Sequence, residues 1–294
     1  MQTPPGYSMR RILQLMARIA VVLVLGGFCG ATLVRLAPGF GTSEEELDTR
    51  LSQGSVEALR QAHHTDESLG GFYIRYLGQL LHGDLGMSET FQQPVRQLLA
   101  ERFPETLKSV GLGLVLAWVA GLALAVVAVM SRLWLVDLAT SLLASILLCI
   151  PAAVLALLFV FAQAPGRLAL GLIVFPKIFH YAKNLLAQSA MLPHVLMARA
   201  KGAGGFRVLV WHILPVAGPQ LLALAGVSVS LAFAAAIPVE VLCDLPGIGQ
   251  LAWRAAQGRD MELLVILTMI VTLVTVVANS AAELLAQPMR AGDA

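Results

Sequence analysis

The sequence predicts an all-α, polytopic membrane protein with six transmembrane helices and a small helical region outside the membrane. Of its 294 residues, 57% are hydrophobic and only 13% are charged, and the mean hydropathy is +0.77. Soluble domains carry about 25% charged residues, so the composition indicates a membrane protein. Most of the long apolar runs hold about 20 apolar residues, enough to cross a hydrocarbon core of about 30 Å as helices. We place the six spans at residues 12–36, 107–130, 133–162, 168–183, 215–240 and 261–286.

The fourth span, residues 168–183, is the shortest and the most polar. Lys177, His180 and Lys183 interrupt its second half, and Pro176 is expected to kink it. The three cationic residues follow one another at i, i+3 and i+6, and therefore lie loosely on one helix face. Two interpretations stay open. The residues line a polar path through the membrane, or they extend to the cytoplasmic surface from a helix that is leaving the membrane.

Positive charge in the short loops predicts the orientation of the spans. An even number of spans places both termini on one side of the membrane. That side carries eight Lys and Arg residues, against three in the short loops of the opposite side, so we expect both termini in the cytoplasm. The first run has no small-residue cleavage site after it, which predicts an uncleaved first span. The eight are Arg10, Arg11, Arg132, Lys183, Arg199, Lys201, Arg207 and Arg290, and the three are Arg167, Arg254 and Arg259.

The longest polar segment, residues 37–105, is left out of this comparison because long segments are translocated largely regardless of charge. It holds 11 of the 18 acidic residues. Its stretch TSEEELDTR is typical of a helix start, with Thr42 or Ser43 as the cap and acids in the first turn. We expect a mostly helical external region here. The cytoplasmic N-terminus and first span (residues 1–36) precede it, and a five-span core (residues 106–290) follows it.

The sequence offers little for covalent or metal chemistry. It contains no G-x-x-x-x-G-K-[ST], G-x-S-x-G, H-E-x-x-H or C-x-x-C motif. Cys29, Cys149 and Cys243 are far apart, which predicts neither a disulfide framework nor a zinc site. The net charge of +2 and the lack of a basic, aromatic stripe argue against nucleic-acid binding. We expect no catalytic residue, cofactor or metal, and the close pair His63 and His64 is more typical of a solvated surface.

Glu240 is the acidic residue that ends the fifth span, two residues after Pro238 and just before the loop VLCDLPGIGQL. An acid at this depth either lies at the membrane interface or faces a central cavity, and the sequence favours neither. With Lys177 and His180, Glu240 is our candidate for a residue of a translocation path.

The segment MARAKGAGGFRVLVWHILP, residues 197–215, places cations and glycines between two apolar runs. Small residues let a helix approach a partner closely, and cations can pair with acids or carbonyls on that partner. Gly204 and Gly205 are expected to end the helix, and Pro215 to begin the next span. The alternative is an ordinary cytoplasmic loop whose cations only set the orientation.

Five motifs, in this order along the chain, connect the sequence to a known family. They are RRILQL…LVRLAPGF, FYIRYLGQLLHGDLGMS, RFPETL, ARAKG…HILP and LPGIGQL. Together they resemble the integral-membrane permease subunits of bacterial ABC importers, in the dipeptide, oligopeptide and nickel branch. The resemblance runs nearly from end to end.

The resemblance implies the ABC importer permease fold and a multi-pass protein of the bacterial inner membrane. It implies half of a translocation path for a small solute, most often a di- or oligopeptide, without an ATPase site of its own. The implied partners are a second permease subunit, cytoplasmic ATP-binding subunits, an extracytoplasmic solute-binding protein and the lipid bilayer. It places the ATPase-coupling loop at about residues 184–212, with Ala198, Arg199, Ala200, Lys201, Gly202, Arg207, His212 and Pro215 as candidate coupling residues.

The resemblance is weakest just before the coupling residues, from Gln188 to Met197. The family often has Glu at the first of these positions and Asp-Tyr where this chain has Pro193 and His194. Pro193 either breaks the coupling helix or starts it. Two other functions remain as alternatives: a secondary transporter, which usually shows inverted repeats that we do not find here, and a diverged, non-transporting membrane scaffold.

Overall fold

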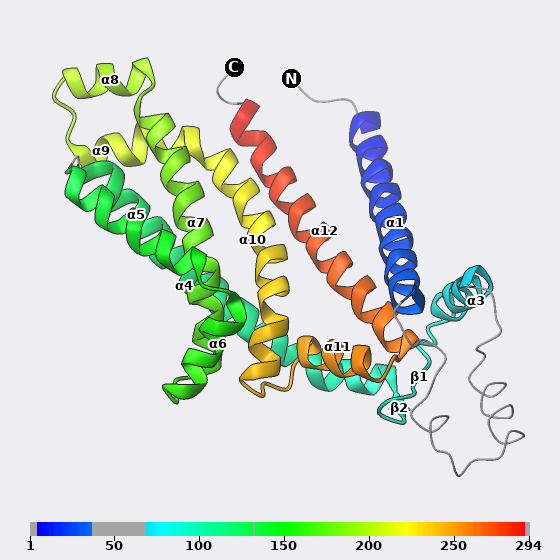
Figure 1. The fold of residues 1–294 in the computed structure, drawn as a ribbon. Coiled ribbons are helices and arrows are strands. Elements are labelled where there is room, and N and C mark those ends of the chain that lie inside the picture. The colour runs from blue at the N-terminus through cyan, green and yellow to red at the C-terminus, as the bar shows by residue number, and fades with distance from the viewer. Residues whose placement is uncertain (1–4, 37–68, 132, 292–294) are drawn as a thin grey trace, which may run out of the picture. The chain divides into compact units, whose positions relative to one another are not determined.

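The computed structural model describes residues 5–36, 69–131 and 133–291, which are almost entirely helical (Figure 1). The chain divides into two compact units. Unit 1 comprises residues 1–101 and 251–273, and unit 2 comprises residues 102–250 and 274–294. The predicted helix start at Thr42 or Ser43 and the pair His63 and His64 lie outside the described residues.

Unit 1 contains α1 (Pro5–Leu36) and the short helix α3 (Leu69–Leu81), which packs on it. The Tyr73 hydroxyl donates a hydrogen bond to the Val24 carbonyl at 2.6 Å. The Tyr73 ring meets Phe28 edge to face, with 5.6 Å between the ring centroids. Burial raises the pKa of Tyr73, which keeps this phenol a donor. The described end of the external region is thus attached to the first helix through one tyrosine.

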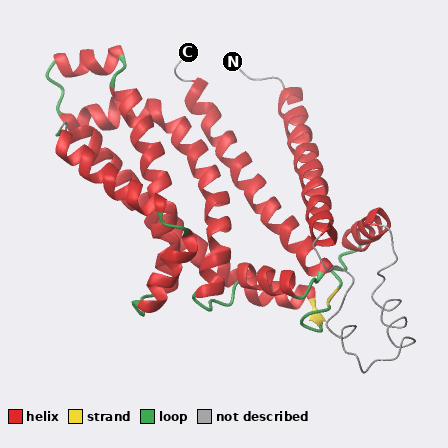
Figure 2. Cartoon of the chain, in the orientation of Figure 1, coloured by secondary structure: helices red, strands yellow, loops and turns green. Residues whose placement is uncertain are grey.

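A small β-hairpin follows α3 and departs from the all-α expectation. Figure 2 shows its two short strands, β1 (Met87–Ser88) and β2 (Gln93–Pro94), which pair antiparallel. Gly86, before β1, has φ +76, a conformation that side chains other than glycine rarely adopt. Two-residue strands carry too little periodic signal for a sequence pattern to reveal them.

Glycines of α1 also contact α12 (Met261–Ala291) within unit 1. A Cβ atom at Gly30 would lie 2.8 Å from Thr268 Oγ1, and one at Gly26 would lie 3.2 Å from Thr272 Oγ1. The two glycines form a Gly-x-x-x-Gly pair, which lets helix backbones approach closely in a membrane, where association depends on packing.

Unit 2 is built around helices that lie side by side in Figure 1, with α8 and α9 at one end of the unit and α6 at the opposite end. The helices α4, α11 and α12 each run through both units. The elements are α4 (Val95–Ser131), α5 (Trp134–Cys149), α6 (Ala152–Phe161), α7 (Gly166–Ala190), α8 (Pro193–Ala200), α9 (Gly205–Val208), the π-helix η2 (Leu209–Ile213), α10 (Leu214–Leu242) and α11 (Ile248–Gln257).

Small residues again set the helix packing in unit 2. A Cβ atom at Gly113 of α4 would lie 2.8 Å from Leu170 of α7, and one at Gly121 would lie 3.0 Å from Ile178. The α7 face that meets α4 is buried, and both Leu170 and Ile178 are 0% exposed. A hydrophobic core cluster of unit 2 lies where α6, α7 and α10 meet, at Ala156, Ala169 and Val239, each 0% exposed.

The predicted span 133–162 is broken into two helices. Ile150 is extended (φ −80, ψ 124), and Pro151 precedes the first residue of α6. A residue before proline avoids the helical region, so α5 ends at Cys149. The α5 and α6 axes differ by 95°. Pro151 is a local sequence signal for this break, which the prediction of one continuous span did not use.

Three of the predicted spans are confirmed by length and composition within the described residues. They lie in α4, in the continuous helix from Gly205 to Leu242, and in α12 from Met261 to Gln287. The bent pair α5 and α6 counts as a fourth span if it crosses the membrane as one unit. Within α1, the stretch Met16–Gly30 is an apolar helix that is shorter than a span. α7 is not among the helices that meet the length and composition of a span.

Candidate functional site

The candidate coupling segment begins where α7 ends. The last helical residue of α7 is Ala190, and Leu192 is extended (φ −67, ψ 144). Pro193 then occupies the first position of α8, where its missing N–H and fixed φ are no disadvantage. Pro193 therefore starts the short helix and does not break it.

The end of α8 differs from the sequence prediction, which placed it at Gly204 and Gly205. Gly202 has φ +83, its N–H donates to the Arg199 carbonyl at 2.9 Å, and the next N–H, of Ala203, donates to Ala198 at 3.1 Å. This pair of bonds is the Schellman motif, which satisfies the last carbonyls of a helix. Gly202 therefore ends α8, and Gly204 is the cap residue before α9.

The segment is anchored on one side and exposed on the other. Val195, Val208 and Ile213 are 0% exposed and fix α8, α9 and η2 to unit 2. The cations Lys201 and Arg207 are exposed. The exposed large apolar residues are Met191 (75%), Leu196 (48%), Met197 (60%), Phe206 (81%) and Trp211 (74%). Such a concentration of exposed apolar and cationic side chains is typical of a docking surface.

Within the described residues, His212 Nδ1 is the buried side-chain nitrogen or oxygen that lacks a hydrogen-bond partner. His212 lies in η2, where the Leu214 N–H donates to the Leu209 carbonyl, five residues back. Pro215 has no N–H and its ring excludes a carbonyl four residues earlier, which accounts for the wider turn. Single π turns of this kind occur often at functional sites.

The remaining candidate residues of the segment occupy the same surface. Ala198 and Arg199 are partly buried in the last turns of α8, whereas Ala200 is exposed. Pro215 is exposed in the first turn of α10. The eight candidate coupling residues lie between the last turns of α8 and the first turn of α10, and some are exposed while others are partly buried.

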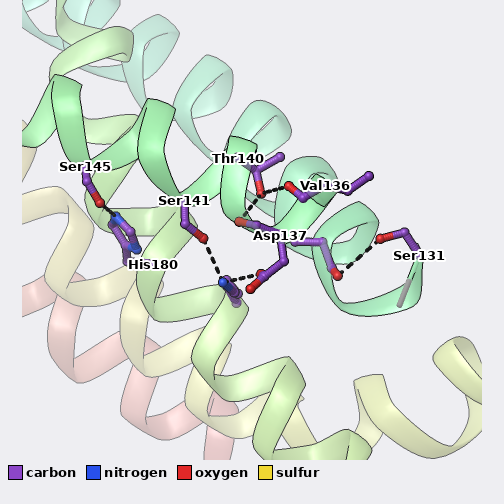
Figure 3. Close-up of polar contacts among 9 residues, drawn as sticks. Ser131, Val136, Asp137, Thr140, Ser141, Ser145 and His180 are labelled. Carbon is purple, nitrogen blue, oxygen red and sulfur yellow. Dashed lines mark hydrogen bonds and ion pairs between the residues drawn. The ribbon is translucent and has the colours of Figure 1, made fainter. Parts of the chain in front are cut away.

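The cations of α7 differ in their surroundings (Figure 3). Lys183 forms an ion pair with Asp137 of α5 and donates to Ser141 Oγ at 2.8 Å. One turn earlier, His180 Nε2 lies 3.4 Å from Ser145 Oγ. Lys177 is exposed. Residues 137, 141 and 145 are spaced by four on α5 and therefore share one face, so a polar strip connects α5 with α7.

Glu240 lies inside unit 2 and is 0% exposed. Its Oε1 accepts a hydrogen bond from the Thr106 hydroxyl at 2.6 Å, and its Oε2 accepts one from the Gly249 N–H at 2.6 Å. Burying a charge is costly unless it is paired or hydrogen-bonded. The carboxylate therefore has structural partners on α4 and at the start of α11.

The motif RFPETL, at residues 102–107, supplies Thr106 and three further polar contacts in this region. Arg102 donates to the Gln250 side chain at 3.2 Å. Glu105 accepts from Arg167 Nη2 and from Lys108 Nζ, each at 2.7 Å. Lys108 is three residues from Glu105. The other two partners, Gln250 and Arg167, lie 148 and 62 positions away, so no sequence signal connected them with the motif.

A second buried carboxylate, Asp260, organises unit 1. Its Oδ1 accepts from the Leu263 N–H at 3.1 Å, as an N-terminal cap does in α12. Its Oδ2 accepts from Ser88 Oγ at 2.5 Å and from the Thr90 N–H at 3.1 Å. The β-hairpin, whose first strand ends the stretch HGDLGMS, is thereby held on the start of α12. Sequence analysis did not single out Asp260.

The neighbouring Glu262 closes the same contact. It accepts from the Met87 N–H at 3.1 Å, and its backbone carbonyl accepts from the Tyr76 hydroxyl at 3.3 Å. A Cβ atom at Gly86 would overlap the Glu262 carboxylate. Burial raises the pKa of Tyr76, and the nearby carboxylates raise it further. The phenol therefore stays protonated and able to donate.

A family model described as binding-protein-dependent transport system inner membrane component matches residues 113–291. The match covers more than half of the chain and includes the coupling segment, α10 and all of α12. The chain belongs to this family. It is therefore of the ABC importer permease type, a multi-pass inner-membrane family, and this membership argues against a secondary transporter.

The chain is similar to curated proteins over most of its length. It is 28% identical over 263 residues to a Brucella suis protein named as a peptide permease, covering 80% of this chain and 82% of that protein. It is 27% identical over 286 residues to the oligopeptide transport system permease protein OppB of Escherichia coli, covering 90% and 91%. For OppB of Salmonella typhimurium the identity is 26% over 286 residues, with the same coverage.

Among solved structures, the chain matches one from inward-facing conformations of the MetNI methionine ABC transporter. The TM-score is 0.59 and the identity 18%, and the match covers 69% of this chain and 99% of that chain. At this identity the likeness concerns the fold, which is the ABC transporter permease fold.

Proposed function

We propose that the protein is the permease subunit of an ATP-driven importer of di- and oligopeptides. Membership of the binding-protein-dependent family supports the importer class, and the names of relatives at 26–28% identity support peptides as the substrate class. The chain spans the membrane six times, with both termini in the cytoplasm. It pairs with a second permease, receives its solute from an extracytoplasmic binding protein, and leaves ATP hydrolysis to separate cytoplasmic subunits.

The observation that carries this proposal is the exposed surface of residues 191–215. Its buried anchors fix it to unit 2, and its exposed apolar and cationic side chains suit a protein partner. The candidate coupling residues in it are Ala198, Arg199, Ala200, Lys201, Gly202, Arg207, His212 and Pro215. In this proposal an ATP-binding subunit docks here, and its movement shifts the permease between conformations that bind the partners differently.

The path assignment of Lys177, His180 and Glu240 stays a prediction. Lys177 is the exposed member of the three, whereas Glu240 is enclosed by its hydrogen-bond partners. A variant that replaces Lys177 by Met therefore addresses the path more directly than one at Glu240.

The proposal is tested with the complex produced from its own gene cluster and reconstituted in liposomes. Reversing a coupling charge by Lys201→Glu is expected to lower both the ATPase subunit retained on purification and the ATP-dependent uptake of radiolabelled tri-alanine, each about tenfold. Arg254→Glu is the matched control, because Arg254 is also an exposed cation but lies on α11, outside the segment.

Three outcomes contradict parts of the proposal. Equal ATPase retention in Lys201→Glu and wild type refutes this docking surface. Retention of the ATPase without ATP-dependent uptake of any di- or oligopeptide refutes the substrate class. Absence of ATPase subunits from the wild-type complex favours the alternative of a non-transporting scaffold.

A further inference from the structure

The first turn of α11 receives its capping groups from two other helices. The residue before Ile248 is glycine, so no side chain adjacent in sequence can cap the helix. The first amides of a helix have no acceptor within it. The Ile248 N–H donates to Thr106 Oγ1 at 2.7 Å. The amides of Gly249 and Gln250 point at Glu240 Oε2, at 2.6 and 3.4 Å.

Thr106 is the centre of this arrangement. Its hydroxyl accepts a hydrogen bond from the Ile248 N–H and donates one to Glu240 Oε1 at 2.6 Å, so it acts as acceptor and donor at the same time. Thr106 and Glu240 are each 0% exposed. The carboxylate lies at the N-terminal end of α11, where the helix dipole favours negative charge. Removing either side chain leaves buried N–H or O–H groups without partners.

Two glycines of the loop make this close approach possible. A Cβ atom at Gly247 would overlap the Glu240 carboxylate. One at Gly249 would lie 2.8 Å from Glu240 Oε2 and 2.8 Å from the Ile237 Cα. The Pro-Gly-x-Gly pattern of the sequence therefore fits around one buried acid.

The same loop is fastened by backbone and side-chain bonds. The Leu245 N–H donates to the Glu240 carbonyl at 2.9 Å. The Gln250 side chain donates to Asp244 Oδ1 at 2.7 Å. Asp244 has φ +49, an uncommon conformation for a residue other than glycine. The loop thus holds one defined shape, which depends on Glu240 through both its backbone and its side chain.

We propose that Glu240 and Thr106 are positioning residues that lock residues 243–250 against α4 and α10, and that transport requires this lock. The part of the proposal that concerns transport rests on the proposed function. The part that concerns the lock does not, because it can be measured on the purified protein without any solute.

Cys243 is a natural reporter of the lock. It follows α10 and is partly buried, with Sγ 3.8 Å from the Ala156 carbonyl and close to Gly166. Burial raises the pKa of the Cys243 thiol, so its reaction with a maleimide is slow while the loop stays in place. Replacing the two exposed cysteines, Cys29 and Cys149, by serine leaves this single thiol.

The experiment compares Thr106→Val with Thr106→Ser in this background, in the full complex. Valine keeps the shape of threonine but cannot accept from Ile248 or donate to Glu240. We expect it to label at Cys243 about tenfold faster than the parent and to transport tri-alanine about tenfold more slowly. Serine keeps the hydroxyl and is expected to restore both rates to within about twofold. Glu240→Gln, which retains one acceptor oxygen, is a second variant if Thr106→Val does not fold.

The outcomes separate the lock from the proposed function. Wild-type labelling rates in both Thr106→Val and Glu240→Gln overturn the lock. Faster labelling with unchanged uptake overturns the requirement of the lock for transport. If the parent complex shows no ATP-dependent uptake at all, the proposed function fails, and the labelling comparison still decides whether Glu240 and Thr106 hold the loop.

Discussion

Gly202 and Gly204 illustrate how one residue type has different roles at positions only two residues apart. Both are exposed, and a Cβ atom at either position would meet open space. Only Gly202 has a positive φ, of +83, whereas Gly204 has φ −65. The difference between them is therefore one of backbone conformation and not of packing.

We predict that Gly202→Ala destabilises the end of α8 and that Gly204→Ala does not. A residue with a Cβ atom pays about 1–2 kcal/mol in the left-handed region. Hydrogen exchange of the amides of Lys201, Gly202 and Ala203, which donate within the α8 cap, should therefore speed up about tenfold in Gly202→Ala. Equal exchange rates in the two alanine variants would show that the cap contributes nothing to α8.

The two buried acids differ in how far a sequence can reveal them. Asp260 caps α12 through Leu263, three residues later, and Asp followed by an apolar run is a local pattern that sequence analysis can use. Glu240 caps α11 together with Thr106, which is 134 positions away. Its depth in the fifth span was visible, but its partners depend on how α4 and α10 pack.

At the scale of elements, the bend between α5 and α6 and the polar strip on α7 belong to the same part of unit 2. Pro151 ends α5 for a local steric reason. The face of α5 that carries Asp137, Ser141 and Ser145 meets α7 through Lys183 and His180. The sequence showed the cations of α7 and their shared face, but not that α5 supplies an anion to one of them.

We predict that Asp137 and Lys183 stabilise the contact between α5 and α7 as a pair. The Lys183 side chain is 20% exposed and that of Asp137 is 47% exposed, so the pair lies near the surface of unit 2. We therefore expect a coupling energy of about 0.5–1 kcal/mol. A double-mutant cycle with Asp137→Asn and Lys183→Met, followed by thermal unfolding in detergent, measures it.

Exchanging the two charges provides the control for this pair. Asp137→Lys combined with Lys183→Asp keeps an ion pair in reversed order and is expected to be more stable than either single reversal. Additive effects in the cycle would mean that the ion pair does not hold α5 to α7.

At the scale of the whole molecule, the number of spans is the quantity that matters most for function. Among the residues that the structure describes, three helices satisfy the length and composition of a span, and the bent pair α5 and α6 counts as a fourth if it crosses the membrane as one unit. The proposed six spans require in addition that α1 and α7 cross. α7 carries Lys177, His180 and Lys183, which lower its hydropathy.

We predict that labelling from the two sides of the membrane places residues 93 and 201 on opposite sides, as the six-span topology requires. In a cysteine-free background, Lys201→Cys should react with a membrane-impermeant maleimide only in inside-out vesicles. Gln93→Cys, an exposed position of β2, should react only in right-side-out vesicles. Labelling of both positions from the same side would contradict the proposed topology.

The sequence by itself determined the membrane class and the family, and it predicts where the coupling segment lies. These follow from local quantities: apolar runs long enough for a bilayer, loop charges and motifs that are contiguous in the chain. Family membership and relatives confirmed the family prediction. For Pro193, the sequence left two alternatives, a start or a break of the coupling helix, because proline has few favourable positions in a helix.

Only the tertiary structure decided the bonds that fix the loops. The hydroxyl of Thr106 and the carboxylate of Glu240 meet because α4 and α10 pack together around the start of α11. Asp260 and Ser88 meet because the β-hairpin folds back onto α12. A hydrogen bond needs its two atoms within about 3 Å of each other, and for residues more than a hundred positions apart only the packing of the helices can bring them to that distance.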